Sequence, residues 1–390
     1  MKIGQWARLM LAAAPLLAGC KGFWDAPTTT GTGTGTASGV FFVANQKTSQ
    51  IAGYSFAAAT TAPTAISGSP YTLGSAPLCM AISANGGFLY VSTGGGILAY
   101  SVASTGALTA IGSGAISSDT PTSMVVDPNG YWLIESISGS GTLTTIPLVP
   151  TTGLVDTTAK LQSIELPNVQ LTGIAISPSG STDPYVFVTM GTGGTAVIPF
   201  TYTSTTSTPL GAVGTIKVKG TQGAAQAVAV DPTNRLLYVG ETVAATGTQT
   251  GGLRVFTIGA SSAMTELTGA SYPYTTGGTG PSAILATTNY VYVANKAVSG
   301  STTGNITGFA ITTTGSVYSL TAVSTIGSGT GTVGLAEDST GTYVLAVNAS
   351  GSPDLNVYSF DTTTAGKLDS YATAATGTDP VVAVAVAAVP

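Results

Sequence analysis

One pattern recurs along the chain from residue 40 onward. It consists of an apolar strand, a turn containing Gly, Asn or Pro, a second apolar strand, a third strand and a more polar fourth. The first turn is the clearest marker, as residues 77–86 and 121–130 illustrate. Repeats marked in this way begin at residues 77, 121, 171, 225, 281, 332 and 380, at spacings of 44–56 residues. Blades of four strands in β-propellers have about this length. The repeat therefore predicts an all-β propeller domain over residues 40–390.

The two ends of this domain complement each other. Residues 40–45 read as a second strand with no first strand before it, and residues 381–389 read as a first strand with nothing after it. Pairing these segments completes one blade and closes the ring, which removes the open sheet edges that would otherwise promote aggregation. Six full blades and one composite blade predict a seven-bladed β-propeller of four-stranded blades.

Composition excludes several classes of protein. Apolar residues make up 43% of the chain and charged residues 7%, whereas disordered chains are rich in charge and poor in apolar residues. The net charge is −5 and no basic run occurs, which argues against a nucleic-acid partner. There is no histidine, and no metal-binding or phosphate-binding motif is present. We therefore expect no metal and no cofactor, and we expect a monomer.

The N-terminus has the features of an export signal. Lys2 and Arg8 precede an apolar stretch over residues 9–17, which is too short to span a membrane. The following Leu-Ala-Gly-Cys at 17–20 resembles the lipobox of bacterial lipoproteins, in which the Cys carries a diacylglycerol. An ordinary secretory signal with a coincidental Cys remains the alternative.

These features divide the N-terminal region into a signal peptide over 1–19 and a lipidated Cys20 with a flexible Thr/Gly linker over 20–39. The lipid on Cys20 would hold the protein at a membrane. Lys21, in place of Asp, favours the outer membrane or the extracellular face of the cell envelope. Cys79, the second cysteine, lies in an apolar run and is expected to be a small buried core residue.

The strand and turn sequences also suggest a family. The Tyr-Val-Ala-Asn at 292–295 and the Asp-Pro-Asn-Gly at 127–130 resemble the YVTN/lactonase-like propellers, and the resemblance extends over residues 40–390. That family includes the propeller type of bacterial 6-phosphogluconolactonase. The resemblance implies lactone hydrolysis, for which enzymes of the family are proposed to use His, Arg and Glu. This chain has no His.

Propellers generally bind ligands at the mouth of the central channel, on loops that follow second strands or lead into first strands. The residues expected to end the second strands are Asn45, Thr93, Ile137, Met190, Glu241, Asn295 and Asn348. Adding the nearby lysines, the ligand-binding candidates are Asn45, Lys47, Thr93, Glu241, Asn295, Lys296 and Asn348; Glu135 lies two residues before Ile137.

Glu241 is the candidate catalytic base, with Lys296 or Arg254 as the group that polarises a carbonyl. The competing interpretation is structural, because Asn often ends a strand by bonding to turn backbone. Four turn residues, Asn85, Asp127, Asn129 and Asp231, are expected to stabilise turns between first and second strands.

These sequence features are compatible with two functions. The first is a lipid-anchored module that binds a small molecule, a glycan or an envelope protein through the channel mouth. The alternative is a lactonase-type hydrolase, similar to 6-phosphogluconolactonase, acting on a sugar lactone or another lactone.

Overall fold

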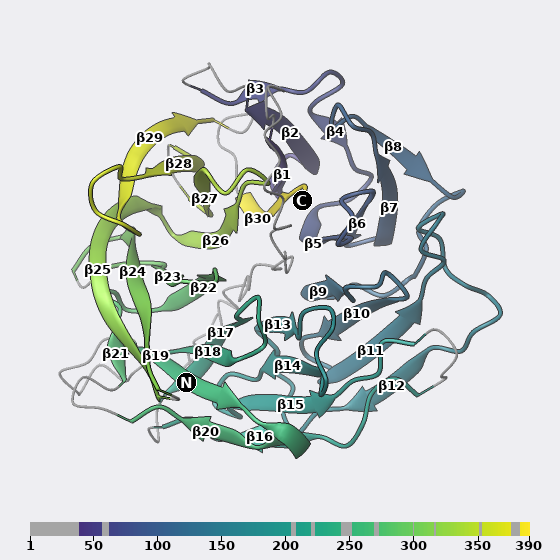
Figure 1. Cartoon of the computed structure of the whole chain (residues 1–390). Coiled ribbons are helices and arrows are strands. Elements are labelled where there is room, and N and C mark those ends of the chain that lie inside the picture. The colour runs from purple at the N-terminus through teal and green to yellow at the C-terminus, as the bar shows by residue number, and fades with distance from the viewer. Residues whose placement is uncertain are drawn as a thin grey trace, which may run out of the picture.

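The computed structural model describes residues 39–56, 62–203, 208–219, 223–242, 252–268, 273–298, 300–315, 317–350, 353–375 and 383–390. Within these residues the strands form seven antiparallel sheets around a central axis (Figure 1). The predicted all-β, seven-bladed propeller is therefore confirmed. The predicted signal peptide over 1–19, the predicted lipidation site Cys20 and the predicted linker up to residue 38 lie outside the described residues.

The blades are numbered here in chain order. Blade 1 contains β1 (Gly39–Asn45), β2 (Gln50–Phe56), β3 (Thr64–Ala65), β4 (Tyr71–Thr72) and β30 (Ala383–Ala388). Blade 2 contains β5 (Pro77–Ile82), β6 (Phe88–Thr93), β7 (Gly96–Val102) and β8 (Leu108–Ile111). Blade 3 contains β9 (Ser123–Val126), β10 (Trp132–Ile137), β11 (Thr142–Pro147) and β12 (Gln162–Glu165). Blade 4 contains β13 (Gly173–Ile176), β14 (Tyr185–Thr189), β15 (Thr195–Pro199) and β16 (Gly214–Ile216).

The remaining blades follow the same order from the axis outward. Blade 5 contains β17 (Ala224–Val230), β18 (Leu236–Thr242), β19 (Gly252–Ile258), the short 3₁₀ helix η1 (Ala260–Ser262), β20 (Met264–Glu266) and β21 (Tyr274–Thr275). Blade 6 contains β22 (Pro281–Ala286), β23 (Tyr290–Asn295), β24 (Thr303–Thr314) and β25 (Val317–Thr330). Blade 7 contains β26 (Thr332–Glu337), β27 (Tyr343–Asn348), β28 (Leu355–Phe360) and β29 (Leu368–Ala374).

The ring closes through the pairing expected from the sequence. Strand β30, near the C-terminus, pairs antiparallel with β1, so that Phe41 faces Ala388 and Val43 faces Val386. Strand β30 thereby becomes the innermost strand of blade 1, as Figure 1 shows beside the C-terminal label. The closure gives β1 a partner on both sides, so its backbone groups are paired along both edges.

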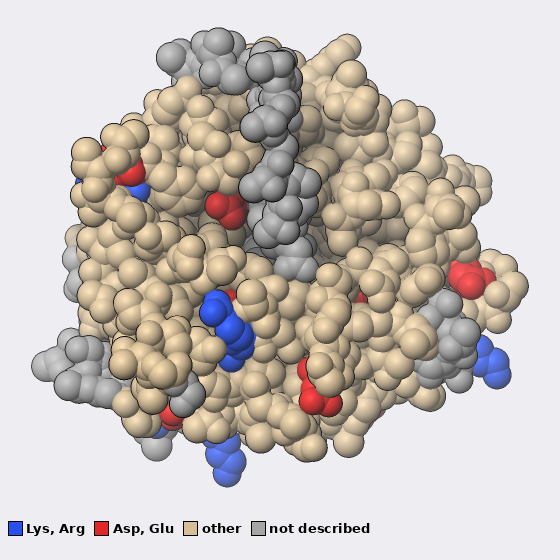
Figure 2. All heavy atoms as spheres, viewed as in Figure 1, with Lys and Arg blue, Asp and Glu red and all other residues tan. Residues whose placement is uncertain are grey.

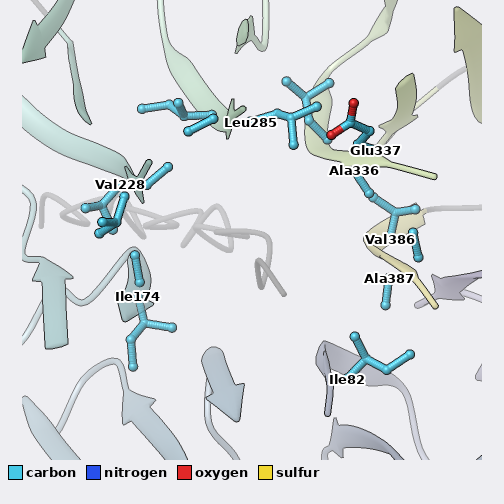
Figure 3. Close-up of a pocket in the computed structure, with 15 residues that line it drawn as sticks. Ile82, Ile174, Val228, Leu285, Ala336, Glu337, Val386 and Ala387 are labelled. Carbon is cyan, nitrogen blue, oxygen red and sulfur yellow. The ribbon is translucent and has the colours of Figure 1, made fainter. Parts of the chain in front are cut away.

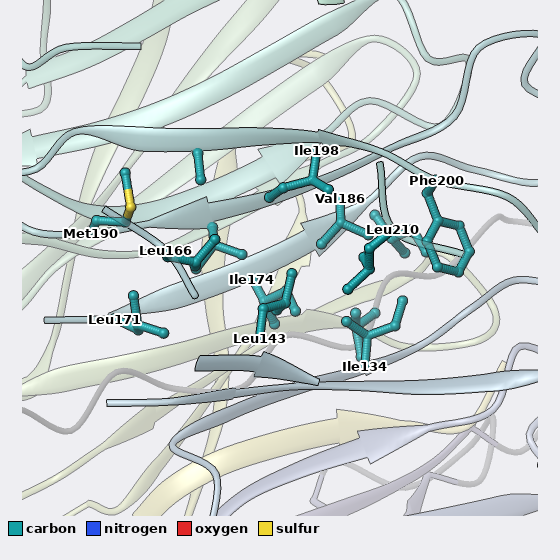
Figure 4. Packing of buried hydrophobic residues seen from close by; sticks show 14 of the residues in the cluster. Ile134, Leu143, Leu166, Leu171, Ile174, Val186, Met190, Ile198, Phe200 and Leu210 are labelled. Atoms are coloured by element: carbon teal, nitrogen blue, oxygen red, sulfur yellow. The ribbon is translucent and has the colours of Figure 1, made fainter. Parts of the chain in front are cut away.

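The core consists of apolar layers between neighbouring blades. Figure 4 shows one layer, in which Ile134 and Leu143 of blade 3 pack against Ile174 and Val186 of blade 4. These four side chains are at most 1% exposed. Alternate residues of each strand point toward opposite neighbours, so each blade contributes to two layers. Burial of an Ile, Leu or Val side chain stabilises the fold by roughly 1.5–3 kcal/mol.

The turns between first and second strands are held by buried aspartates. Asp127 Oδ1 accepts the N–H of Trp132 at 2.6 Å, and its Oδ2 accepts the N–H of Asn129 at 3.0 Å. Asp231 and Asp338 accept backbone N–H groups at the equivalent places in blades 5 and 7. The structural role predicted for the turn aspartates is confirmed at Asp127 and Asp231.

The positions of Asn85 and Cys79 also agree with the predictions from the sequence. Asn85 Oδ1 accepts the N–H of Gly87 at 3.0 Å within the corresponding turn of blade 2. Cys79 is fully buried between blades 2 and 3, as its apolar surroundings predicted, and its thiol donates to Pro121 O at 3.5 Å. No helix in the described part of the chain is long and apolar enough to cross a membrane.

Candidate functional site

The ring has two faces with different loops. On one face the first strands begin and the second strands end, as the pairings of Pro77 with Thr93 and of Thr332 with Asn348 illustrate. We call this the entry face. The opposite face carries the turns between first and second strands, and we call it the turn face. The site predicted from the sequence lies on the entry face.

The predicted strand ends are close to those observed. Five second strands end at the residues expected, namely Asn45, Thr93, Ile137, Asn295 and Asn348. Strand β14 ends at Thr189, one residue before Met190, and β18 continues to Thr242, one residue beyond Glu241. The period-two pattern of the sequence therefore placed the entry-face residues to within one position.

The asparagines on this face are buried, and Asn295 and Asn348 are hydrogen-bonded to nearby strands and loops. Asn295 Nδ2 donates to Thr276 O at 3.0 Å and to Asn305 Oδ1 at 2.8 Å, while its Oδ1 accepts the hydroxyl of Thr276 at 2.9 Å. Asn348 Oδ1 accepts the hydroxyl of Thr332 at 2.8 Å. Asn45 is also fully buried. At Asn295 and Asn348 these bonds tie the strand end to neighbouring loops and strands.

The other predicted residues are separated from one another along the ring. Thr93 is buried and its hydroxyl donates to Gly96 O at 2.9 Å. Lys47 is exposed in blade 1. Lys296 is partly buried in blade 6, and this burial lowers the pKa of its ammonium. One cavity lies on the axis of the ring, and two hollows lie beside turns between strands. Thr93, Lys47 and Lys296 line none of the three.

Glu241, by contrast, belongs to a compact charged group. Arg254 Nη1 donates to Glu241 Oε1 at 2.7 Å, and Arg254 Nε donates to Glu266 Oε1 at 2.6 Å. We call Glu241, Arg254 and Glu266 the Glu–Arg–Glu cluster. Glu241, the candidate base, and Arg254, one of the two candidate electrophiles, thus form a direct ion pair. Lys296, the other candidate partner, is absent from the cluster.

The three members come from consecutive strands of blade 5. Glu241 lies at the end of β18, Arg254 lies near the start of β19, and Glu266 ends β20. In the antiparallel register Arg254 faces Val239, two residues before Glu241, so the two long side chains meet diagonally. The ring of Phe256 lies 4.9 Å from the guanidinium carbon and supports it from one side.

Backbone groups of the loop that enters blade 5 complete the surroundings. Arg254 Nη1 also donates to Lys217 O at 2.8 Å, and Glu241 Oε2 accepts the N–H of Lys219 at 3.2 Å. The Arg254 and Glu241 side chains are 7% and 6% exposed, whereas the Glu266 side chain is 26% exposed. Two carboxylates therefore share one guanidinium, and the outer carboxylate is within reach of water.

Sequence reasoning missed Glu266. It lies on a short fourth strand, whereas the candidate residues were taken from the ends of second strands and their neighbours. A usable signal was Arg254, a charged residue at an inward strand position in a chain where only 7% of residues are charged. A buried arginine requires acidic partners, and the neighbouring strands offer few.

A second carboxyl is buried without such a partner. Glu135 on β10 is fully buried and neither of its carboxyl oxygens has a hydrogen-bond partner among the described residues. Burial, with the nearby Asp119 carboxylate as a further cause, raises the pKa of Glu135 to about 9. Glu135 is therefore protonated and neutral at pH 7.

On the face shown in Figure 2, charged side chains are few and scattered. Over the described residues, no group of three or more His, Cys, Asp or Glu side chains is placed to hold a metal ion.

Comparison with known proteins confirms the lactonase-like resemblance. The family model for the lactonase seven-bladed β-propeller matches residues 41–170. No curated protein matches the chain. Among solved structures, a candidate 6-phosphogluconolactonase from Bacteroides uniformis is 16% identical, with a TM-score of 0.67, covering 90% of this chain and 99% of that one.

Two other structures show how far this likeness extends. The periplasmic gluconolactonase of Pseudomonas aeruginosa is 18% identical with a TM-score of 0.65, covering 91% of this chain and 99% of that one. Hydrazine synthase of Kuenenia stuttgartiensis has a TM-score of 0.57 at 14% identity, covering 83% and 95%. Proteins named for different reactions therefore share this architecture, and at such identities the likeness establishes the fold alone.

Proposed function

We propose that this lactonase-like propeller is a hydrolase that opens a lactone at the Glu–Arg–Glu cluster. The observation that carries the proposal is the buried ion-paired cluster itself, found at the one predicted residue that joins other charged groups. The match of residues 41–170 to the lactonase model supports the choice of reaction.

The cluster contains groups suited to this chemistry. The Glu266 carboxylate, 26% exposed, accepts a proton from a water molecule, and the water oxygen adds to the lactone carbonyl carbon. The Arg254 guanidinium stabilises the negative charge that develops on the carbonyl oxygen. Glu266 then returns the proton to the ring oxygen as the carbon–oxygen bond breaks, which gives a hydroxy acid. Glu241, the more deeply buried carboxylate, holds Arg254 in place.

This proposal reverses the order of the two functions derived from the sequence. The envelope binding module depended on polar residues converging at the channel mouth, and Asn295 and Asn348 instead use their amides for bonds within the protein. No observation supports that function, whereas the lactonase comparisons support the hydrolase.

The place of action is a separate part of the proposal. It is supported by the lipobox-like sequence at 17–20, with Cys20 as the site of lipidation. The hydrolase would then work as a monomer anchored at the cell envelope. Radiolabelled palmitate should be incorporated into the wild-type chain in bacteria and should be absent from Cys20→Ser, and equal labelling of both would refute the anchor.

A lactone panel tests the activity. Sugar lactones and alkyl lactones are incubated with the purified propeller, and acid release is followed at constant pH. Wild type should open at least one member, and Glu241→Gln should reduce the rate because Arg254 loses a charged partner. Glu165→Gln, which changes an exposed glutamate on blade 3, serves as the matched control. Failure of wild type to open any lactone, or equal rates for all three proteins, would refute the proposal.

A further inference from the structure

The central axis contains a cavity that the proposed reaction does not use. Its wall is formed by the innermost strands of six blades, and Figure 3 labels Ile82, Ile174, Val228, Leu285, Val386 and Glu337 among its residues. Every lining side chain other than Glu337 is Ala, Val, Ile or Leu. Several of these residues end their strands, so the cavity lies toward the turn face, away from the Glu–Arg–Glu cluster.

The cavity is small. Its volume is about 60 Å³. A single water needs roughly 10–15 Å³ by the same measure, so the cavity accommodates on the order of five small groups. A short unbranched alkyl chain with one head group has about this size.

Glu337 is the one polar side chain in this wall, and Figure 3 shows its carboxyl oxygens among otherwise apolar sticks. It ends β26, and the structure contains no hydrogen bond or ion pair to its carboxylate within the described residues. Burial, assisted by the charge of Asp338, raises its pKa to about 7.

Among the described residues no cation is placed to pair with this carboxylate. Asp338, the next residue, is also acidic, and its own oxygens are bonded to its turn. Tyr292 is close enough to Glu337 for the carboxylate to raise its pKa, but the Tyr292 hydroxyl donates to Gly366 O at 2.8 Å. The strands that complete the cavity wall contribute no other titratable side chain to it.

We propose that the axial cavity binds a short, unbranched alkylammonium ion, with the alkyl chain among the apolar side chains and the ammonium on the carboxylate of Glu337. Charge complementarity selects the head group, because an anion would be repelled and a neutral alcohol would leave the partly buried carboxylate without a counter-charge. The absence of other polar groups from the wall selects an apolar tail in place of a polyol. This site is independent of lactone hydrolysis.

The probe for this site is n-butylammonium. The control compounds are 1-butanol, which is neutral, and butanoate, which is anionic, and both have the same chain length. Binding is measured by isothermal titration calorimetry on the purified propeller at pH 8.0. Wild type should bind butylammonium at least 10-fold more tightly than either 1-butanol or butanoate. Affinity should fall at pH 5.5, because Glu337 is then protonated while the amine stays charged.

Two variants separate charge from shape. Glu337→Gln keeps the side-chain size and should weaken butylammonium binding at least 10-fold, and Leu285→Phe should abolish binding by filling the cavity while retaining the carboxylate. Glu165→Gln, on the surface, should bind as wild type does. Equal binding of butanol and butylammonium, unchanged affinity in Glu337→Gln, or no binding by folded wild type would overturn the proposal. Lactone turnover should be unaffected in Glu337→Gln, so the outcome of this test is separate from that of the proposed function.

Discussion

At the scale of single residues, the molecule concentrates its buried charge in a few places. With only 7% charged residues, the fold still buries Glu135, Glu241 and Arg254. Glu241 and Arg254 compensate each other, whereas Glu135 has no cation beside it. Each arrangement has a measurable consequence for stability.

Glu135 should make the fold sensitive to alkaline pH. Its pKa is raised from 4.5 to about 9, so between those values the folded state retains a proton that the unfolded state has lost. The contribution of Glu135 is therefore fully present below pH 4.5 and is lost as pH rises toward 9, with a slope of about 1.4 kcal/mol per pH unit. Glu135→Gln lacks this titration.

Urea unfolding at pH 5, 7 and 8.5 measures the difference. The free energy of unfolding of wild type should decline with pH relative to that of Glu135→Gln. Parallel pH dependence of the two proteins would contradict a neutral, buried Glu135. Glu165→Gln, at an exposed position on β12, should follow wild type throughout.

Arg254 should matter for stability as well as for activity. Replacing it with Met keeps much of the side-chain volume but leaves two carboxylates without their shared cation. Breaking a buried ion pair by removing one partner costs about 3–5 kcal/mol. Lys160→Met, which removes an exposed cation, should cost far less. A loss below about 1 kcal/mol in Arg254→Met would argue that the cluster is solvated.

At the scale of strands and turns, much of the architecture could be predicted from sequence. Strand alternation and turn composition are local properties of the sequence, and every repeat shows the same pattern. A strand that is ambiguous in one repeat can therefore be assigned from the others. The second-strand ends from Asn45 to Asn348 were located to within one residue for this reason. The extra short strands β4 and β21, which add to blades 1 and 5, were not predicted. In blade 2 the corresponding contact is a single bridge between Ile97 and Ser117.

The site was harder to predict because it depends on contacts between strands. Whether Asn295 faces a ligand or a neighbouring loop is decided by Thr276 and Asn305, which lie 19 and 10 residues away in sequence. Glu266 and Glu337 were missed for the same reason. Their roles follow from what surrounds them in the folded ring, and a linear pattern contains no such information.

Strand β30 provides a test of closure. Deleting residues 383–390 removes the innermost strand of blade 1 and exposes one edge of β1. The loss should be comparable with the whole stability of a typical domain, about 5–15 kcal/mol, and the exposed edge should promote aggregation. Size-exclusion chromatography and thermal unfolding measure both effects, with deletion of Pro390 alone as control. A monomeric truncated chain with an unchanged melting temperature would show that closure contributes little.

At the scale of the whole molecule, three structural features occupy different parts of the ring. The apolar layers between blades hold the fold together, the entry side of blade 5 carries the Glu–Arg–Glu cluster, and the axis holds a small apolar cavity toward the turn face. Because the cluster lies on the outer strands of blade 5 near the entry face and the cavity lies at the turn-face ends of the innermost strands, a change at the cluster should leave the cavity unaltered.

Glu266→Gln is the sharpest test of whether the Glu–Arg–Glu cluster hydrolyses a lactone. The amide retains the size of Glu266 but cannot accept the proton of the attacking water. With a lactone that wild type opens, we expect kcat to fall by about 10²–10⁴-fold while thermal unfolding shows the fold intact. If Glu266→Gln is folded and retains the wild-type kcat, the cluster is not the catalytic site.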